Sequence, residues 1–132
     1  MNLVDSSGWL EFFSESKNAS IFAKPIENLE ALLVPSITIT EVFKKILQTK
    51  NEPSALKAAA HMRQGRVVDL DTDLALSAAK IGYDLRLPLA DSIILATARL
   101  YKAVLWTQDE DFKGLEGVRY IPMDPRPGSS PR

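Results

Sequence analysis

The chain has 132 residues, 45% hydrophobic and 25% charged, as expected for one globular domain that can bury a core. Its 16 Lys and Arg residues nearly balance its 17 Asp and Glu residues, which excludes a globally basic nucleic-acid-binding protein. Cysteine is absent and His61 is the single histidine, which excludes disulfides, thiolate zinc sites and chemistry that needs two histidines of one chain. Carboxylates, hydroxyls, lysines and arginines remain to perform any chemistry.

Short apolar runs bounded by turn residues alternate with longer stretches of helical periodicity. The runs predict strands at 3–4, 32–34, 67–68, 103–106 and 118–121. The stretches predict helices at about 9–13, 21–29, 38–47, 51–62, 71–81 and 88–101. Ser6 or Ser7 is expected to cap the first helix, and Pro25 to lie near the start of the second. This alternation predicts a three-layer α/β/α sandwich with a mainly parallel central sheet over residues 1–121.

The two ends of the chain show neither a targeting nor a membrane-spanning pattern. Residues 1–5 lack the basic and long apolar segments of a signal peptide, and no apolar run approaches the ~20 residues that span a bilayer. We therefore expect a cytoplasmic protein with no membrane association. Residues 122–132 are rich in Pro, Gly and Ser, which predicts a disordered C-terminal tail.

Three carboxylates are expected at the carboxyl edge of the sheet, where open parallel sheets bind their ligands. Asp5 ends the first strand, and Asp109 follows the strand at 103–106 by three residues. Glu41 lies in the first turn of the helix that follows the second strand. If the strands are parallel, all three carboxylates reach the same edge.

Asp91 is the most informative acid, because the helix around it is apolar or small nearly all round, from Leu89 to Ala98. Such a helix is usually buried on most sides. Asp91 shares a face with Ile94 and Leu95, so its carboxylate needs a cation, a metal ion or strong hydrogen-bond donors.

Each acid also has a purely structural interpretation. Asp5 could cap a helix, and Glu41 could complete a capping box with Thr38. Asp91 could complement a helix dipole, and Asp109-Glu110-Asp111 could form an ordinary acidic turn. The convergence of four acids on one edge of one sheet nevertheless favours a functional site.

Four segments resemble the PIN domain, and in particular the small single-domain VapC-type ribonuclease toxins of toxin–antitoxin pairs. They are Leu3-Val4-Asp5-Ser6-Ser7-Gly8-Trp9, the helical Glu41, Leu87-Pro88-Leu89-Ala90-Asp91-Ser92-Ile93-Ile94-Leu95-Ala96-Thr97-Ala98, and Leu105-Trp106-Thr107-Gln108-Asp109-Glu110-Asp111-Phe112. The similarity runs in order from residue 1 to about residue 121. The two longer segments are fairly specific, whereas Asp5 or Glu41 alone would not be.

The resemblance implies an endoribonuclease that depends on Mg²⁺ or Mn²⁺ and uses Asp5, Glu41, Asp91 and Asp109 as an acidic quartet. Asp111 is a further acid that the resemblance offers as a metal ligand. The resemblance also implies a homodimer, and a cognate antitoxin protein that inhibits the enzyme by occupying its cleft.

The implied metal suits these residues, because Mg²⁺ prefers carboxylate, water and phosphate oxygens. A bound cation of this kind can supply a hydroxide nucleophile and stabilise a leaving oxygen without any histidine. We expect Asp5, Asp91 and Asp109 to bind the metal directly, and Glu41 to bind it or to orient a water.

RNA binding needs contacts beyond the carboxylates. Ser6 and Thr107 match hydroxyl positions that line PIN sites, and Arg86 could reach a phosphate or pair with Asp84. Between Lys44 and Arg66 the sequence contains six basic residues and only one acid. This stretch could follow a phosphate backbone or could be a solvated helix face.

Two other functions fit part of the pattern. An aspartyl phosphotransferase also places Asp after its first strand, but its usual Asp-x-Asp is absent because residue 7 is serine. A catalytically silent PIN-like interaction module would have the fold without the activity. The complete acidic quartet argues against the silent module.

Overall fold

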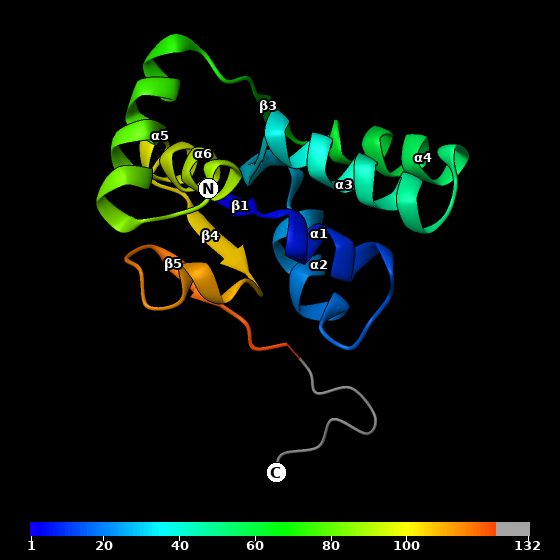
Figure 1. Ribbon diagram of the computed structural model, residues 1–132. Coiled ribbons are helices and arrows are strands. Elements are labelled where there is room, and N and C mark those ends of the chain that lie inside the picture. The colour runs from blue at the N-terminus through cyan, green and yellow to red at the C-terminus, as the bar shows by residue number, and fades with distance from the viewer. Residues whose placement is uncertain (124–132) are drawn as a thin grey trace.

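The computed structural model describes residues 1–123 (Figure 1). Five strands form one parallel sheet in the order β3-β2-β1-β4-β5, which confirms the predicted sheet type. The strands are β1 (Asn2–Val4), β2 (Leu32–Pro35), β3 (Arg66–Val68), β4 (Val104–Thr107) and β5 (Val118–Tyr120). Residues 124–132, most of the predicted tail, lie outside the described residues.

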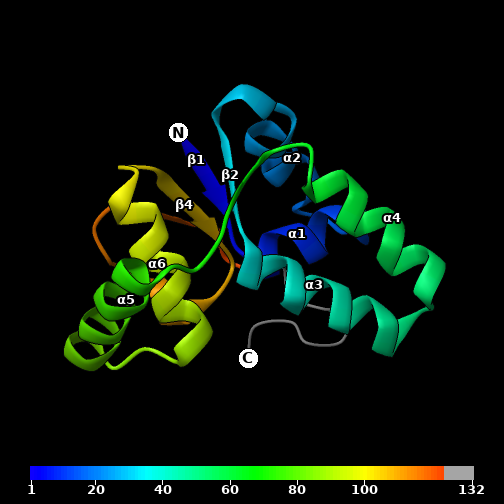
Figure 2. The ribbon, with the colours of Figure 1, turned by 90° about the horizontal axis from the view of Figure 1, so that it is seen from above.

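Helices cover both faces of the sheet. Within residues 1–123 they are α1 (Ser6–Phe13), α2 (Ala19–Glu27), α3 (Ser36–Thr49), α4 (Glu52–Met62), α5 (Thr72–Leu85) and α6 (Leu89–Leu100). Figure 2 shows α5 and α6 on one side of β1, β2 and β4, and α1, α2 and α4 on the other side. The three-layer α/β/α sandwich is therefore confirmed. None of the helices in the described part of the chain is long and apolar enough to cross a membrane.

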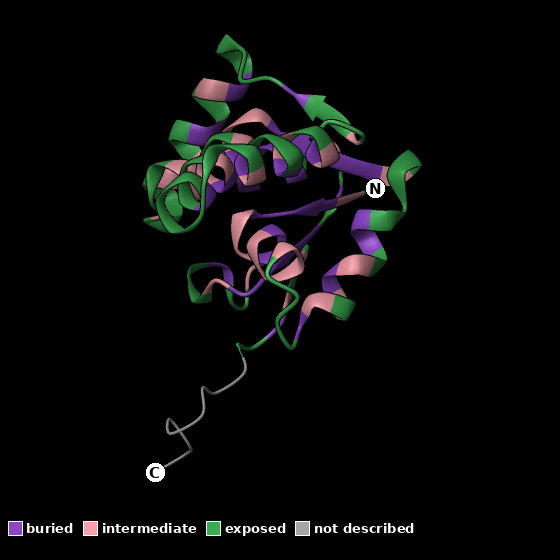
Figure 3. Ribbon diagram, turned by 90° about the vertical axis from the view of Figure 1, so that its right-hand side faces the viewer, coloured by how far each residue is buried: buried purple, intermediate pink, exposed green. Residues whose placement is uncertain are grey.

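The strands separate two apolar cores, because successive side chains of a strand point to opposite faces of the sheet. Leu3 of β1 and Leu105 of β4 belong to the core on the side of α5 and α6. The next residues, Val4 and Trp106, belong to the core formed with α1 to α4. In Figure 3 the strands are mostly buried, and the helices are buried where they face the sheet. Since both faces of the sheet are covered, polar side chains reach solvent at the ends of the strands.

Two helices differ from their predicted apolar pattern. The second helix, α2, starts at Ala19, so Pro25 lies in its last turn rather than near its start. A proline there removes one N–H hydrogen bond and leaves the earlier turn intact. Leu29, the last residue of the helix predicted at 21–29, lies beyond the end of α2 in a 3-10 turn, η1 (Leu29–Ala31), and is exposed. Leu47, an apolar residue at the end of the helix predicted at 38–47, is also exposed.

The start of α3 removes the structural interpretation of Glu41. The helix begins at Ser36, directly after Pro35, and no side chain caps it. Thr38 is therefore buried in the first turn and does not cap the helix. Glu41 lies in the second turn rather than the first, too far along the helix to complete a capping box.

Candidate active site

Asp5 directly follows the central strand β1 and directly precedes α1, so this one residue joins the two elements. Its Oδ1 accepts hydrogen bonds from the Gly8 N–H at 3.1 Å and from the Ser7 hydroxyl at 2.7 Å. Its Oδ2 accepts a hydrogen bond from the Thr107 hydroxyl at 2.5 Å. Asp5, rather than Ser6 or Ser7, therefore caps α1. The cap also fixes the direction of the carboxylate at the edge of the sheet.

The loop after β4 carries two further acids close to Asp5. Thr107 Oγ1 accepts a hydrogen bond from the Asp109 N–H at 2.9 Å, and Asp109 Oδ1 accepts one from the Asp111 N–H at 2.9 Å. The second of these bonds starts a 3-10 turn, η2 (Glu110–Phe112). The ring of Phe112 is fully buried in the core. The loop that carries Asp109 and Asp111 is therefore held by hydrogen bonds at its start and by the packing of Phe112 at its end.

Carboxylates from several elements meet beside this loop. Asp91 lies in the first turn of α6, and one oxygen each of Asp91, Asp109 and Asp111 lie within 4.8 Å of one another. Glu41 Oε1, on α3, is buried and has no hydrogen-bond partner within residues 1–123. A buried acceptor without a donor needs a cation or a water to satisfy it. Clustered carboxylate oxygens are the ligands that hard divalent cations prefer, so this donor set fits Mg²⁺ or Mn²⁺.

Burial and mutual repulsion raise the pKa of three of these acids. Burial, followed by the charges of Asp109 and Asp111, raises the pKa of Asp91 to about 7. Burial raises the pKa of Asp5 to about 6, against the lowering effect of its three hydrogen bonds. Burial and the charge of Asp109 also raise the pKa of Glu41. The charge of Asp109 contributes to the raised pKa of all three acids. The structure therefore brings the predicted quartet and Asp111 close enough to interact electrostatically.

A buried polar network connects the loop to α1 and to the start of α2. The Gln108 N–H donates to Ser7 Oγ at 2.9 Å. The Gln108 side chain donates to Glu11 Oε1 at 3.3 Å and accepts from Asn18 Nδ2 at 2.7 Å. The Asn18 N–H donates to Glu11 Oε2 at 2.9 Å. Both amide side chains are buried, so the network fixes the backbone next to the loop acids.

The hydroxyl groups have roles that the sequence prediction identified only in part. The Ser6 side chain opposes the rise in the pKa of the Glu41 carboxyl. Thr107 is fully buried with its hydroxyl on Asp5, so it positions an acid and does not face solvent. Ser7, which links Asp5 to the loop, was missed. Its place two residues after Asp5, in the first turn of α1, was the one available signal.

Arg86, the predicted phosphate contact, ends α5 with a left-handed backbone conformation (φ 57°) and is exposed. Asp84, named as its alternative partner, instead pairs with Lys80 at 2.5 Å. A contact between Arg86 and a phosphate stays a prediction.

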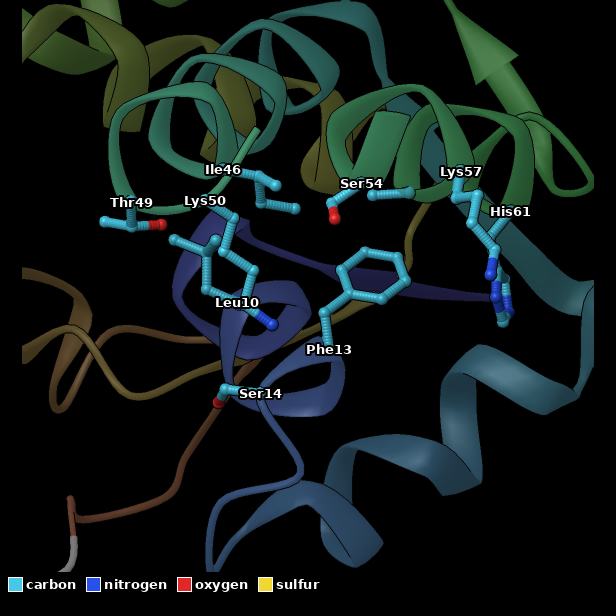
Figure 4. A pocket seen from close by; sticks show the side chains of 10 residues that line it. Leu10, Phe13, Ser14, Ile46, Thr49, Lys50, Ser54, Lys57 and His61 are labelled. Atoms are coloured by element: carbon cyan, nitrogen blue, oxygen red, sulfur yellow. The ribbon is translucent and has the colours of Figure 1, made fainter. Parts of the chain in front are cut away.

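A cavity of about 340 Å³ lies between α1, α3 and α4, away from the acids (Figure 4). Phe13, Ile46 and His61, one from each helix, contribute to its lining. Lys50 and Lys57 also line it, so two members of the predicted basic stretch lie at this cavity. No carboxylate lines the cavity, which is therefore separate from the acidic site.

The comparison with protein families matches the PIN domain over residues 3–118. The chain belongs to the PIN domain family. The matched range includes all five acids described above. A search of curated proteins finds no significant match.

Solved structures share the fold of this PIN domain. A toxin–antitoxin complex from Klebsiella pneumoniae is similar at a TM-score of 0.77 and 25% identity, covering 93% of this chain and 100% of that one. VapC20 from Mycobacterium tuberculosis, described as a sarcin–ricin loop cleaving toxin, is similar at 0.73 and 16% identity, covering 95% and 100%. VapBC2 from Rickettsia felis, bound to a promoter DNA fragment, is similar at 0.71 and 12% identity, covering 93% and 98%. The last two likenesses concern the fold alone.

Proposed function

We propose that this PIN domain is a metal-dependent endoribonuclease that acts in the cytoplasm as the toxin of a toxin–antitoxin pair. The observation that carries the proposal is the cluster of Asp91, Asp109 and Asp111 oxygens within 4.8 Å of one another, together with the unpartnered Glu41 oxygen, whose carboxyl is affected by the charge of Asp109. Membership of the PIN family and the likeness to the Klebsiella pneumoniae toxin–antitoxin complex support it. A silent interaction module would have no need to hold these acids so close together.

In this proposal, each residue of the site has a separate role. Asp91, Asp109 and Asp5 would hold Mg²⁺ or Mn²⁺, and Asp111, whose oxygen lies within 4.8 Å of those of Asp91 and Asp109, could share in the binding. A bound cation supplies a polarised water and stabilises charge on the cleaved phosphodiester. The free oxygen of Glu41 orients the attacking water and accepts its proton. Thr107 and Ser7 hold the Asp5 carboxylate in place throughout.

The direct test is cleavage of a fluorescent single-stranded RNA by the purified protein. We expect cleavage with Mg²⁺ or Mn²⁺, none in excess chelator, and none by Asp5→Asn, because the amide cannot supply the negative oxygen that the cation requires. Glu30→Gln is the matched control, since this acid is exposed before β2, at the opposite edge of the sheet. Cleavage by Asp5→Asn at the wild-type rate would contradict the assignment, and an inert wild type would favour the silent module.

The toxin role has a separate test. Expression of the chain alone should arrest growth of a bacterial host, measured as colony count after induction. Co-expression of the small protein encoded beside it should relieve the arrest by direct binding, and size-exclusion chromatography should report that complex together with the homodimer. A harmless wild type, in a host where the Asp5→Asn protein reaches the same level, would remove the toxin role and leave the nuclease role standing.

A further inference from the structure

A groove of about 700 Å³ opens directly beside the carboxylates. Asp109 and Asp111, two of the three clustered acids, line one part of it. Lys113 and Tyr120 line another part. The same groove therefore contains carboxylates that can bind a cation, a basic side chain and an aromatic ring.

The fold explains why a cation and a ring meet at this position. Tyr120 ends β5 and is paired with Thr107, so its ring lies at the same edge of the sheet as the acids. Lys113 follows the last residue of η2 and is exposed. Its ammonium group lies 5.6 Å from the centre of the Tyr120 ring, a cation–π distance. Each residue thus stabilises the position of the other.

We infer that this groove binds the nucleotide next to the scissile phosphate of a single-stranded RNA, with Tyr120 stacking on the base and Lys113 contacting its phosphate. This inference rests on the proposed nuclease function. Aromatic rings stack on unpaired bases of any sequence, and such bases are presented by loops and single strands rather than by duplex RNA. Lys113 supplies a positive charge that can attract a phosphate to a groove whose other charged lining residues are acids.

Stacking and phosphate contact predict a defect in binding rather than in chemistry. Tyr120→Leu should raise KM for a short single-stranded RNA about ten-fold while kcat changes less than two-fold, and Tyr120→Phe should behave as wild type because the ring remains. Lys113→Gln should weaken binding and reduce its salt dependence, whereas Lys113→Arg should preserve both. The dissociation constant is measured independently by fluorescence anisotropy in an Asp5→Asn background that does not cut the RNA.

Tyr101→Leu is the matched control. Tyr101 also makes a cation–π contact, with the Arg66 guanidinium 5.0 Å from its ring centre. It lies at the C-terminal end of α6, whereas Asp91 lies in the first turn of this helix. The Tyr101→Leu variant should keep the wild-type KM and dissociation constant. Melting curves of every variant report folding, and Lys113→Gln carries the test if Tyr120→Leu does not fold.

The outcomes separate the inference from the function on which it rests. A wild-type protein that cuts RNA, together with folded Tyr120→Leu and Lys113→Gln variants of unchanged KM and affinity, overturns the nucleotide groove and leaves the nuclease intact. A wild type that neither binds nor cuts RNA with either metal overturns both. Loss of affinity in Tyr120→Leu and Lys113→Gln, with Tyr120→Phe and Lys113→Arg unaffected, supports the groove.

Discussion

The carboxylate of Asp91 lies at the start of an apolar helix, with an oxygen within 4.8 Å of oxygens from Asp109 and Asp111. Its pKa of about 7 lies well above the ordinary value of 3.8, so near neutral pH the folded protein binds a proton that the unfolded chain has lost. The contribution of Asp91 to stability is therefore complete below about pH 4 and is lost as the pH rises through 7. A metal ion and a proton compete for the same oxygens.

We expect Asp91→Asn to abolish RNA cleavage and yet to melt about 3 °C above the wild type at pH 8 without metal, because the amide carries no charge. At pH 5.5 the difference should shrink, since Asp91 of the wild type is then protonated. Mg²⁺ or Mn²⁺ should raise the melting temperature of the wild type and leave the variant nearly unchanged. Scanning calorimetry at both pH values, with and without metal, measures all of these effects.

Glu116→Gln provides the control for that comparison, because this acid is exposed between η2 and β5. It should follow the wild type at both pH values. An Asp91→Asn protein that melts clearly below the wild type at pH 8 without metal would identify Asp91 as a structural hydrogen-bonding residue, and the electrostatic argument for the site would be wrong.

At the scale of elements, the loop between β4 and η2 depends on α1 and α2 for its position. Gln108 joins the loop to Glu11 of α1 and to Asn18, which precedes α2. Groups that orient metal ligands commonly change metal affinity 10–100-fold when they are removed. We therefore expect Asp109 and Asp111 to lose their fixed positions when Gln108 is replaced.

Gln108→Leu preserves volume but removes the side-chain hydrogen bonds that join Gln108 to Glu11 and Asn18, so we expect it to weaken metal binding about ten-fold. The Mn²⁺ concentration that gives half of the maximal rise in melting temperature measures this affinity. Gln48→Leu, at an exposed position of α3, is the control. A Gln108→Leu protein with a lower melting temperature but the wild-type Mn²⁺ dependence would show that the network stabilises the fold without positioning the acids.

For the whole molecule, the strands and the sheet type were predictable because apolar runs and their alternation with helices are local properties of the sequence. Helix starts were less predictable, since they depend on contacts from elsewhere in the chain. Asp5 rather than a neighbouring serine caps α1, and Thr107, about a hundred residues later, holds the other oxygen of this carboxylate. The start of α3 at Ser36 follows from the direct join to β2, which no capping residue marks.

The acids of the site followed from topology, because parallel strands bring Asp5 and Asp109 to one edge of the sheet. The same reasoning could not find the groups that hold them. Gln108 meets Asn18 and Glu11 across 90 and 97 residues of sequence. A buried amide network of this kind depends on the final packing of side chains, and no local pattern predicts it.

The position of β1 has a consequence for the order of synthesis. Of the five strands of the sheet, β1 is translated first, yet it lies between β2 and β4 and pairs with both. A nascent chain carries Asp5 and Glu41 early but lacks Asp109 and Asp111 until β4 has been translated. Pairing between such distant segments delays folding. A ribosome making this chain therefore meets the assembled acidic centre only when the domain is almost complete.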